Sequence, residues 1–126
     1  MMFNLDAFEK LDRVIHEKGR LAIMSLLAAN DTLSFKELKE HLRMTDGNLS
    51  VHMRTLEEAG YIAVSKSFVN RKPRTDYSLT IPGKEAFQGY IRILEEIVRQ
   101  SQPASEPQRS PAREPVVLPR KIVSAK

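Results

Sequence analysis

Four hydrogen-bonding side chains lie within one short segment in the middle of the chain: Asn48, Ser50, Arg54 and Thr55. An arginine can take both acceptors of a guanine at once, and smaller polar groups can bind base edges or phosphate oxygens. The chemistry open to these residues is therefore recognition by hydrogen bonds. An ordinary amphipathic helix with a solvated polar side would show the same pattern, so the segment alone fits both interpretations.

A cluster of cations follows that segment, in a stretch without any acidic residue. The cluster consists of Lys66, Arg71, Lys72 and Arg74. The body of the chain is nearly neutral, because residues 1–100 carry 15 Lys and Arg against 14 Asp and Glu. A local basic patch on a near-neutral body predicts contact with a polyanion. A solvated hairpin tip would also account for these charges, and the helix in front of them favours the polyanion.

Catalysis and metal binding find little support in the residue types. The chain has no Cys, and His16, His41 and His52 fall on three different predicted helices. Ser50 and His52 fail as a nucleophile and base, because residues two apart on a helix point about 200° apart. No Gly-rich phosphate loop or convincing carboxylate pair appears. We therefore predict a protein that is not an enzyme and holds no metal and no cofactor.

The elements that position these groups follow from apolar spacing and turn residues. The pattern predicts five helices: four over about 4–16, 18–29, 35–42 and 81–100, and one that follows the N-cap Thr45 and ends at Ala59-Gly60. It also predicts a hairpin of two strands, 64–68 and 75–79, around a basic tip at 70–74 that Pro73 stiffens. A helix that ends at Ala59-Gly60 and leads into a two-stranded ribbon is typical of a winged helix. The predicted fold is mainly α with a small antiparallel sheet of two or three strands, a winged helix-turn-helix.

The helix-turn-helix itself has clear boundary signals. Ser34 and Glu37 form a predicted capping box, and Thr45 is the predicted N-cap of the next helix. Only about three residues then link the two helices, as this motif requires. In the second helix a stripe at i, i+4 and i+7 should face the core: Leu49, Met53 and Leu56.

The opposite side of that second helix is small and polar, which suits insertion into a DNA major groove. Gly47 would let the backbone approach DNA closely. The predicted DNA contacts of this helix are Thr45, Gly47, Asn48, Ser50, Val51, His52, Arg54 and Thr55, with His52 only at the edge. Those of the hairpin are Lys66, Arg71, Lys72 and Arg74.

Three segments resemble the ArsR- and MarR-like winged-helix transcriptional regulators. Residues 16–23, HEKGRLAI, are similar to the segment that opens the second helix of those proteins. Residues 49–62, LSVHMRTLEEAGYI, resemble their recognition helix, and residues 77–84, YSLTIPGK, resemble the opening of their last helix. The resemblance covers about residues 10–100. It implies a dimeric DNA-binding regulator, in which the positions of Ser50, His52 and Arg54 often contact DNA.

Apolar stripes on the first and last predicted helices favour a homodimer. Regulators of this kind usually bind palindromes as two-fold dimers, so we expect these helices to pack across a two-fold axis. The predicted interface consists of Leu5, Phe8, Leu11, Phe87, Tyr90, Ile91, Leu94, Ile97 and Val98. Alternatively, both stripes cover only the core of their own chain.

The chain divides into a predicted domain, residues 1–100, and a basic tail, 101–126. Proline recurs every fourth residue in the tail, at Pro103, Pro107, Pro111, Pro115 and Pro119. This spacing excludes a helix of any length and predicts an extended or disordered segment. Residues 1–10 have no apolar stretch typical of a signal peptide, and the longest uncharged segment of the domain is too short to span a bilayer. We expect a cytoplasmic protein without a membrane contact.

The sequence as a whole predicts a regulator that binds operator DNA as a homodimer. We expect it to block transcription rather than to activate it. A winged helix that binds another protein through the same helix is the main alternative. An enzyme or ligand sensor is a third class, and it would need a polar cluster in the core that the sequence does not reveal. The sequence does not identify an operator, an effector or a role for the tail.

Overall fold

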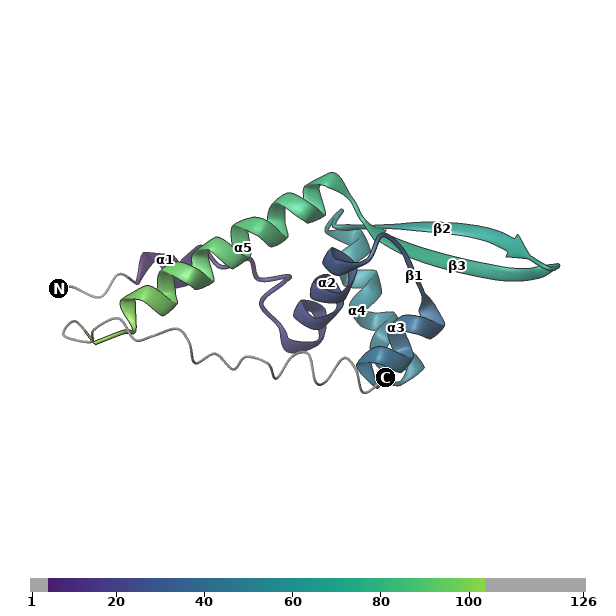
Figure 1. Ribbon diagram of the computed structural model, residues 1–126, viewed down its shortest axis with the longest axis horizontal. Helices are drawn as coiled ribbons and strands as arrows, with labels where there is room; N and C mark the ends of the chain where they lie inside the picture. The colour runs from purple at the N-terminus through teal and green to yellow at the C-terminus, as the bar shows by residue number, and fades with distance from the viewer. Residues whose placement is uncertain (1–4, 104–126) are drawn as a thin grey trace, which may run out of the picture.

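The computed structural model describes residues 5–103. Its elements in chain order are α1 (Asp6–Glu9), α2 (Lys18–Ala29), β1 (Leu33–Ser34), α3 (Phe35–Leu42), α4 (Asp46–Glu58), β2 (Ile62–Val69), β3 (Lys72–Leu79) and α5 (Ile81–Gln100). In Figure 1, α2, α3 and α4 form the centre, the β2–β3 hairpin extends to one side, and α5 runs with α1 to the other. The mainly α fold with a small antiparallel sheet is confirmed. The predicted tail, beyond residue 103, lies outside the described residues.

The sheet has three antiparallel strands in the order β1-β3-β2. β1 is short and pairs with β3 only at Leu33↔Tyr77 and Ser34↔Asp76. β2 and β3 pair along their full length, from Ile62↔Leu79 to Val69↔Lys72. The outer half of the hairpin is therefore a two-stranded ribbon without a third strand beside it.

The turn of the hairpin is shorter than predicted. It consists of Asn70 and Arg71, with φ of 54° and 68°, which is the left-handed conformation that a two-residue hairpin turn of type I′ requires. Lys72, Pro73 and Arg74 lie within β3 and not in the tip. Pro73 is tolerated in β3 because β1 pairs only with residues 76 and 77. The edge of β3 at Pro73 therefore has no neighbouring strand that would need a backbone N–H from it.

The first predicted helix, 4–16, is wrong in its length, because only Asp6–Glu9 is helical. The cause is Asp12, whose Oδ1 accepts hydrogen bonds from the backbone N–H groups of Val14 (2.8 Å) and Ile15 (3.0 Å). Such local bonds compete with a helix. The other carboxylate oxygen accepts a hydrogen bond from the Tyr61 hydroxyl. Burial and this bond raise the pKa of Tyr61 to about 12.

The core lies where α2, α3, α4, the sheet and the first half of α5 meet. Its most buried large side chains are Ile15, Ile23, Met24, Leu38, Leu49 and Leu56. The predicted core stripe of α4 is confirmed, since Leu49, Met53 and Leu56 are all buried. Within residues 5–103, no helix has the length and apolar character that a membrane crossing needs.

The helix-turn-helix is built as predicted. Ser34 Oγ accepts from Glu37 N (3.1 Å) and Glu37 Oε1 accepts from Ser34 N (2.9 Å), which is the capping box. Arg43 ends α3 in the left-handed conformation, φ 55°, and only residues 43–45 separate α3 from α4. Thr45 Oγ1 then accepts from Asn48 N (3.1 Å) and begins α4.

Candidate nucleic-acid interface

The outer face of α4 is solvent-exposed along its first two turns. Its exposed residues from the predicted set are Thr45, Gly47, Asn48, Ser50, Val51 and Arg54. A Cβ built on Gly47 would meet no atom within 4 Å, so the backbone here is open to a close approach. Thr55 is half-buried and its Oγ1 donates to the carbonyl of Val51 (3.2 Å). Apart from Val51 and Arg54 the face consists of small or short polar side chains, which suits a groove-inserted helix.

His52 lies at a different place from the other predicted contacts of α4. Its Nδ1 is 3.7 Å from Glu17 Oε1 and 3.4 Å from Arg20 Nη1, at the start of α2. A Cβ on Gly19 would come 2.6 Å from its Nε2, so α2 packs closely on the imidazole. Glu17 in turn is the N-cap of α2 and accepts from Arg20 N. In this structure His52 therefore fixes α4 against α2.

An ion pair joins the two helices of the helix-turn-helix on the exposed side. Lys39 Nζ lies 2.9 Å from Asp46 Oδ1, and both side chains are exposed. Asp46 is an acidic residue in the first turn of α4, beside the predicted DNA contacts. Lys39 reduces the repulsion that this carboxylate would exert on a phosphate backbone.

The cations of the hairpin fall into two kinds. Lys66, Arg71 and Lys72 are exposed, and within residues 5–103 no acidic side chain pairs with them. Arg74 is also exposed, but it is paired within its own chain, because its Nε donates to Asp76 Oδ1 at 2.9 Å. The cations available to a polyanion without rearrangement are therefore the first three.

A groove of about 590 Å³ separates the hairpin from the start of α3. Lys36 of α3 and Lys72 of β3 both line it, with Phe35, Val69 and Pro73 as apolar parts of the wall. Lys36 is not among the DNA contacts predicted from the sequence. Its position two residues after the N-cap Ser34, on the first helix of the helix-turn-helix, was a usable signal.

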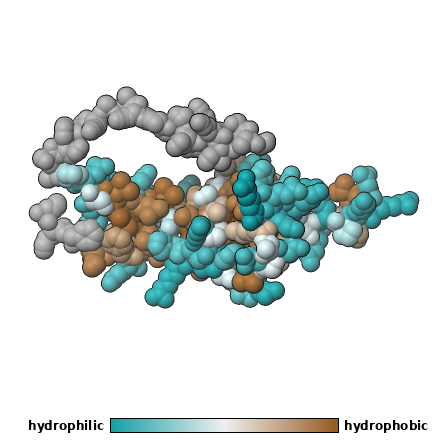
Figure 2. All heavy atoms as spheres, turned by 90° about the horizontal axis from the view of Figure 1, so that it is seen from below, coloured by the Kyte–Doolittle hydropathy of each residue, from teal (hydrophilic) through white to brown (hydrophobic). Residues whose placement is uncertain are grey.

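The surface of α1 and α5 carries apolar residues that the chain itself leaves exposed. The exposed fractions are 54% for Leu5, 43% for Phe8 and 55% for Val98. Figure 2 shows apolar residues gathered at this end of the molecule. The remaining residues of the predicted interface are partly covered by their own chain. Leu11, Phe87, Ile91 and Leu94 pack against the core, and Ile97 is half-buried.

Tyr90 does not fit the predicted interface, because it is buried with 2% exposure. Its hydroxyl lies 2.7 Å from His16 Nδ1, and this contact ties α5 to the segment before α2. Burial raises the pKa of Tyr90. We therefore assign Tyr90 to the core of its own chain.

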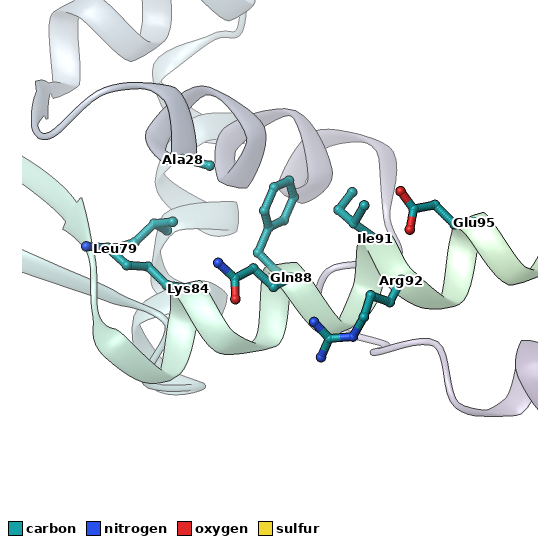
Figure 3. Close-up of a pocket in the computed structure, with 8 residues that line it drawn as sticks. Ala28, Leu79, Lys84, Gln88, Ile91, Arg92 and Glu95 are labelled. Carbon is teal, nitrogen blue, oxygen red and sulfur yellow. The ribbon is translucent and has the colours of Figure 1, made fainter.

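A second hollow, of about 620 Å³, lies between α2 and α5 (Figure 3). Phe87, Ile91 and Leu79 form its apolar part, and the charged lining residues are Lys84, Arg92 and Glu95 of α5. The buried polar groups of the described residues already have partners: Ser34 Oγ serves the capping box and the Tyr90 hydroxyl contacts His16 Nδ1. No three His, Asp or Glu side chains of the described residues are grouped as a metal site requires.

Known proteins share both the fold and this arrangement of α4 and hairpin. Residues 20–98 match the family described as "Winged helix DNA-binding domain". The chain belongs to this winged-helix family. The match includes α3, α4 and the whole hairpin, and it confirms the winged-helix family that the three sequence segments predict.

Individual relatives agree with the assignment. The uncharacterized protein MJ0432 of Methanocaldococcus jannaschii is 35% identical over 79 residues, which are 63% of this winged-helix chain and 86% of that protein. The transcriptional regulator homologue of Pyrococcus horikoshii OT3 superposes with a TM-score of 0.67 at 26% identity, over 75% of this chain and 91% of that chain. The transcriptional repressor BigR of Xylella fastidiosa has a TM-score of 0.52 at 19% identity, over 78% and 86%, and shows the fold alone. The chain therefore carries a winged-helix DNA-binding domain.

Proposed function

We propose that the protein binds a palindromic operator as a homodimer and represses transcription from it. The observation that carries the proposal is the pairing of two exposed surfaces on one chain. The polar outer face of α4 and the basic β2–β3 hairpin both extend from the helix-turn-helix. A winged helix uses such a pair for the major groove and for the backbone beside it.

The residues of α4 have distinct proposed roles. Arg54 is long enough to take the O6 and N7 acceptors of a guanine, and Ser50 lies one turn before it on the same exposed side. Thr45 and Asn48, at the start of the helix, would bind phosphates or base edges. His52 would act indirectly, through the contact with α2 that sets the rotation of α4.

The hairpin would supply the sequence-independent part of binding. Arg71 is in the left-handed conformation with φ of 68°. That conformation costs an L-residue about 1–2 kcal/mol, and glycine would avoid the cost. The presence of arginine at a position that favours glycine suggests that its side chain has a function. We propose that Arg71 binds a phosphate or enters the minor groove. Lys72 and Lys36 would bind phosphates from the two walls of the groove.

The dimer would form through the exposed apolar residues of α1 and α5. Leu5 and Phe8 are at α1 and Val98 is in the last turn of α5, and these two elements lie at the end of the molecule opposite the hairpin (Figure 1). Two chains joined there would leave both hairpins and both α4 helices free for DNA. A two-fold dimer of this kind reads a palindrome, with one half-site for each chain.

Repression is the simpler of the two regulatory outcomes. A bound dimer blocks polymerase by occupying the operator, whereas activation needs a further productive contact. We propose that the protein acts in the cytoplasm, on chromosomal DNA, without catalysis and without a cofactor.

Titration of the full chain against fluorescent random duplex DNA at low salt tests the proposal. We expect binding that weakens steeply as salt rises, because each neutralised phosphate contributes about 0.9 to the log–log slope. Arg54→Ala should retain most of this non-specific binding, whereas the double variant Arg71→Ala, Lys72→Ala should reduce it. Failure to bind any duplex at low salt would support the alternative, a winged helix whose α4 binds a protein.

A further inference from the structure

The third strand of the sheet, β1, lies beside only the inner part of the β2–β3 hairpin. The last pair between β1 and β3 is Ser34↔Asp76. Beyond it, towards the turn, β3 pairs with β2 alone. Such a two-stranded ribbon is only marginally stable in its own right. We call this two-stranded part of the hairpin, from the strand pair Ser65↔Asp76 to the turn, the wing, and its inner end at Asp76 the root. The angle between the wing and α3 must therefore be set at the root.

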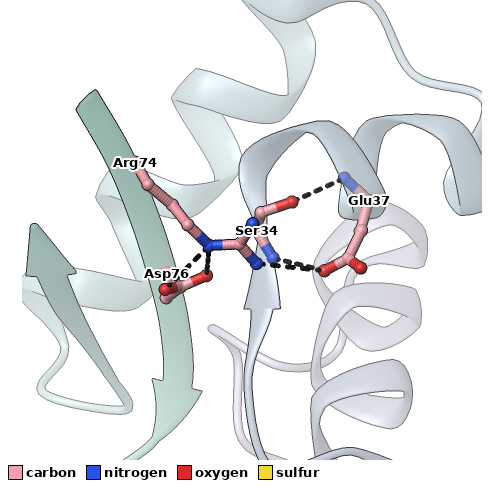
Figure 4. A network of polar contacts seen from close by, with 4 residues as sticks. All are labelled: Ser34, Glu37, Arg74 and Asp76. Atoms are coloured by element: carbon pink, nitrogen blue, oxygen red, sulfur yellow. Dashed lines mark hydrogen bonds and ion pairs between the residues drawn. The ribbon is translucent and has the colours of Figure 1, made fainter. Parts of the chain in front are cut away.

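Arg74 lies at this root and connects the wing to α3 (Figure 4). Its Nε donates to both oxygens of Asp76, at 2.9 and 3.1 Å. Its Nη2 lies 3.9 Å from Glu37 Oε1. The guanidinium thus reaches one carboxylate on its own strand and one on α3.

Glu37 is a fixed partner, because the capping box already holds its side chain. The hydrogen bond from the backbone N–H of Ser34 is the main cause of a lowered pKa of Glu37, and Arg74 adds to the effect. The carboxylate therefore stays ionised at neutral pH. The capping box sets the position of this charge relative to α3, and three residues then connect α3 to α4.

The Phe35–Tyr77 ring contact also joins α3 to β3, but it lies nearer the base of the sheet than Arg74 does. The groove of about 590 Å³ separates Val69, Lys72 and Pro73 of the wing from Phe35 and Lys36 of α3. Arg74 bridges the two walls at the inner end of the ribbon. Ordering the wing before DNA arrives would lower the cost of binding, as preorganisation generally does.

We propose that Arg74 is a positioning residue, which holds the wing at a fixed angle to α3 and α4 through Asp76 and Glu37. This inference rests on the proposed DNA binding. It assigns phosphate contact to Lys36, Arg71 and Lys72, and it removes Arg74 from the predicted contacts of the wing.

The first test measures the wing without DNA. The chain has no native cysteine, so Val69→Cys on the wing and Glu40→Cys on the exposed side of α3 can carry two spin labels. Labelled chain diluted in unlabelled chain gives intramolecular distances by pulsed electron resonance. We expect a narrow distribution that broadens in Arg74→Lys, because lysine keeps the charge but cannot hold two carboxylates in a planar fork. An unchanged distribution overturns the proposal.

The second test measures DNA affinity and its salt dependence in single-substitution variants. Arg74→Lys and Arg74→Ala should weaken binding alike, about twofold to fivefold, with the salt slope unchanged. Glu37→Gln preserves the capping box, since glutamine also serves at that position. If only electrostatics mattered, loss of the negative charge of Glu37 near DNA would tighten binding. If the contact between Arg74 and Glu37 positions the wing, the same substitution weakens binding. Lys72→Ala is the control that lowers the slope.

The outcomes separate this proposal from the proposed function. Full affinity in Arg74→Lys, a lowered slope in Arg74→Ala and tighter binding by Glu37→Gln would together show that Arg74 contacts phosphate, and the proposal would be wrong. If the parent chain binds no DNA, the proposed function fails. The spin-label result then still decides whether Arg74 fixes the wing.

Discussion

Gly83 lies so close to Tyr61 that a Cβ on Gly83 would come 2.1 Å from the Tyr61 carbonyl oxygen. The same carbonyl accepts a hydrogen bond from Thr80 N (3.0 Å), and Thr80 Oγ1 accepts from Gly83 N (2.9 Å) to begin α5. The glycine therefore allows the start of α5 to pack on the junction between α4 and β2. Any side chain at position 83 must move one of these elements.

Gly83→Ala should destabilise the fold by about 3 kcal/mol, because overpacking against a backbone atom cannot be relieved by a rotamer change. Urea denaturation measures the free energy of unfolding. Gly89→Ala, in the same helix, is the matched control. Its Cβ would have only Arg92 Nη2 nearby, at 3.9 Å, so it should gain about 0.5–1 kcal/mol from helix propensity. Equal effects of the two variants would contradict the packing described here.

Gly47→Ala should separate folding from DNA binding. In the free protein the new Cβ meets no atom within 4 Å, so stability should stay the same or rise by a few tenths of a kcal/mol. DNA affinity should fall by about tenfold, because the methyl group stands where the start of α4 approaches DNA. Fluorescence anisotropy and thermal unfolding measure the two effects. Normal binding by Gly47→Ala would place the start of α4 away from DNA.

Arg71→Gly should leave the hairpin intact and weaken DNA binding. Glycine suits the φ of 68° better than arginine does, and Asn-Gly is a preferred pair for a turn of this type. The salt slope should fall by about 0.9, equivalent to one lost phosphate contact. Asn70→Gly, which relaxes the φ of 54° next to it and removes no cation, is the control for the turn. A slope that is unchanged in Arg71→Gly would rule out the phosphate contact.

Val98→Glu should yield a folded monomer with weak operator binding. Val98 is 55% exposed on α5, so a charge there costs little within the chain but several kcal/mol if a partner covers it. Sedimentation equilibrium gives the oligomeric state, and circular dichroism reports the fold. Gln88→Glu places the same charge on a different side of α5 and should remain dimeric. Leu94 is a poorer test position, because it packs against the core of its own chain. A dimeric Val98→Glu protein would place the interface elsewhere.

Local signals in the sequence predicted most of the fold. The ends of α3 and α4 are set by residues next to them in the sequence. These residues are the capping box of Ser34 and Glu37, the N-cap Thr45 and the Ala59-Gly60 pair after α4. The apolar stripe of α4 is likewise a local periodicity. Helix one was predicted too long because apolar spacing does not show that the Asp12 carboxylate would bind its own backbone and Tyr61.

The features that the sequence could not supply depend on residues far apart in the chain. The pairing of β1 with β3 and the ion pair of Arg74 with Glu37 join segments about 40 residues apart. Composition showed Arg74 as one of four similar cations, and only the fold distinguishes it from Arg71 and Lys72. For the same reason the sequence predicts His52 as a DNA contact and Tyr90 as an interface residue. In the fold, residues at the start of α2 contact His52, and His16 contacts Tyr90.

Selection of bound sequences from a random duplex pool, followed by titration of the selected site, tests the central claim most directly. The account predicts an enriched palindrome whose half-sites lie about 10–10.5 bp apart or a multiple of that spacing. It also predicts that Arg54→Ala relaxes the preference at one position in each half-site, at a cost of about 1–3 kcal/mol, while the domain stays folded. A pool without any enriched sequence, or one whose enriched sites ignore the Arg54 substitution, would contradict reading of an operator by α4.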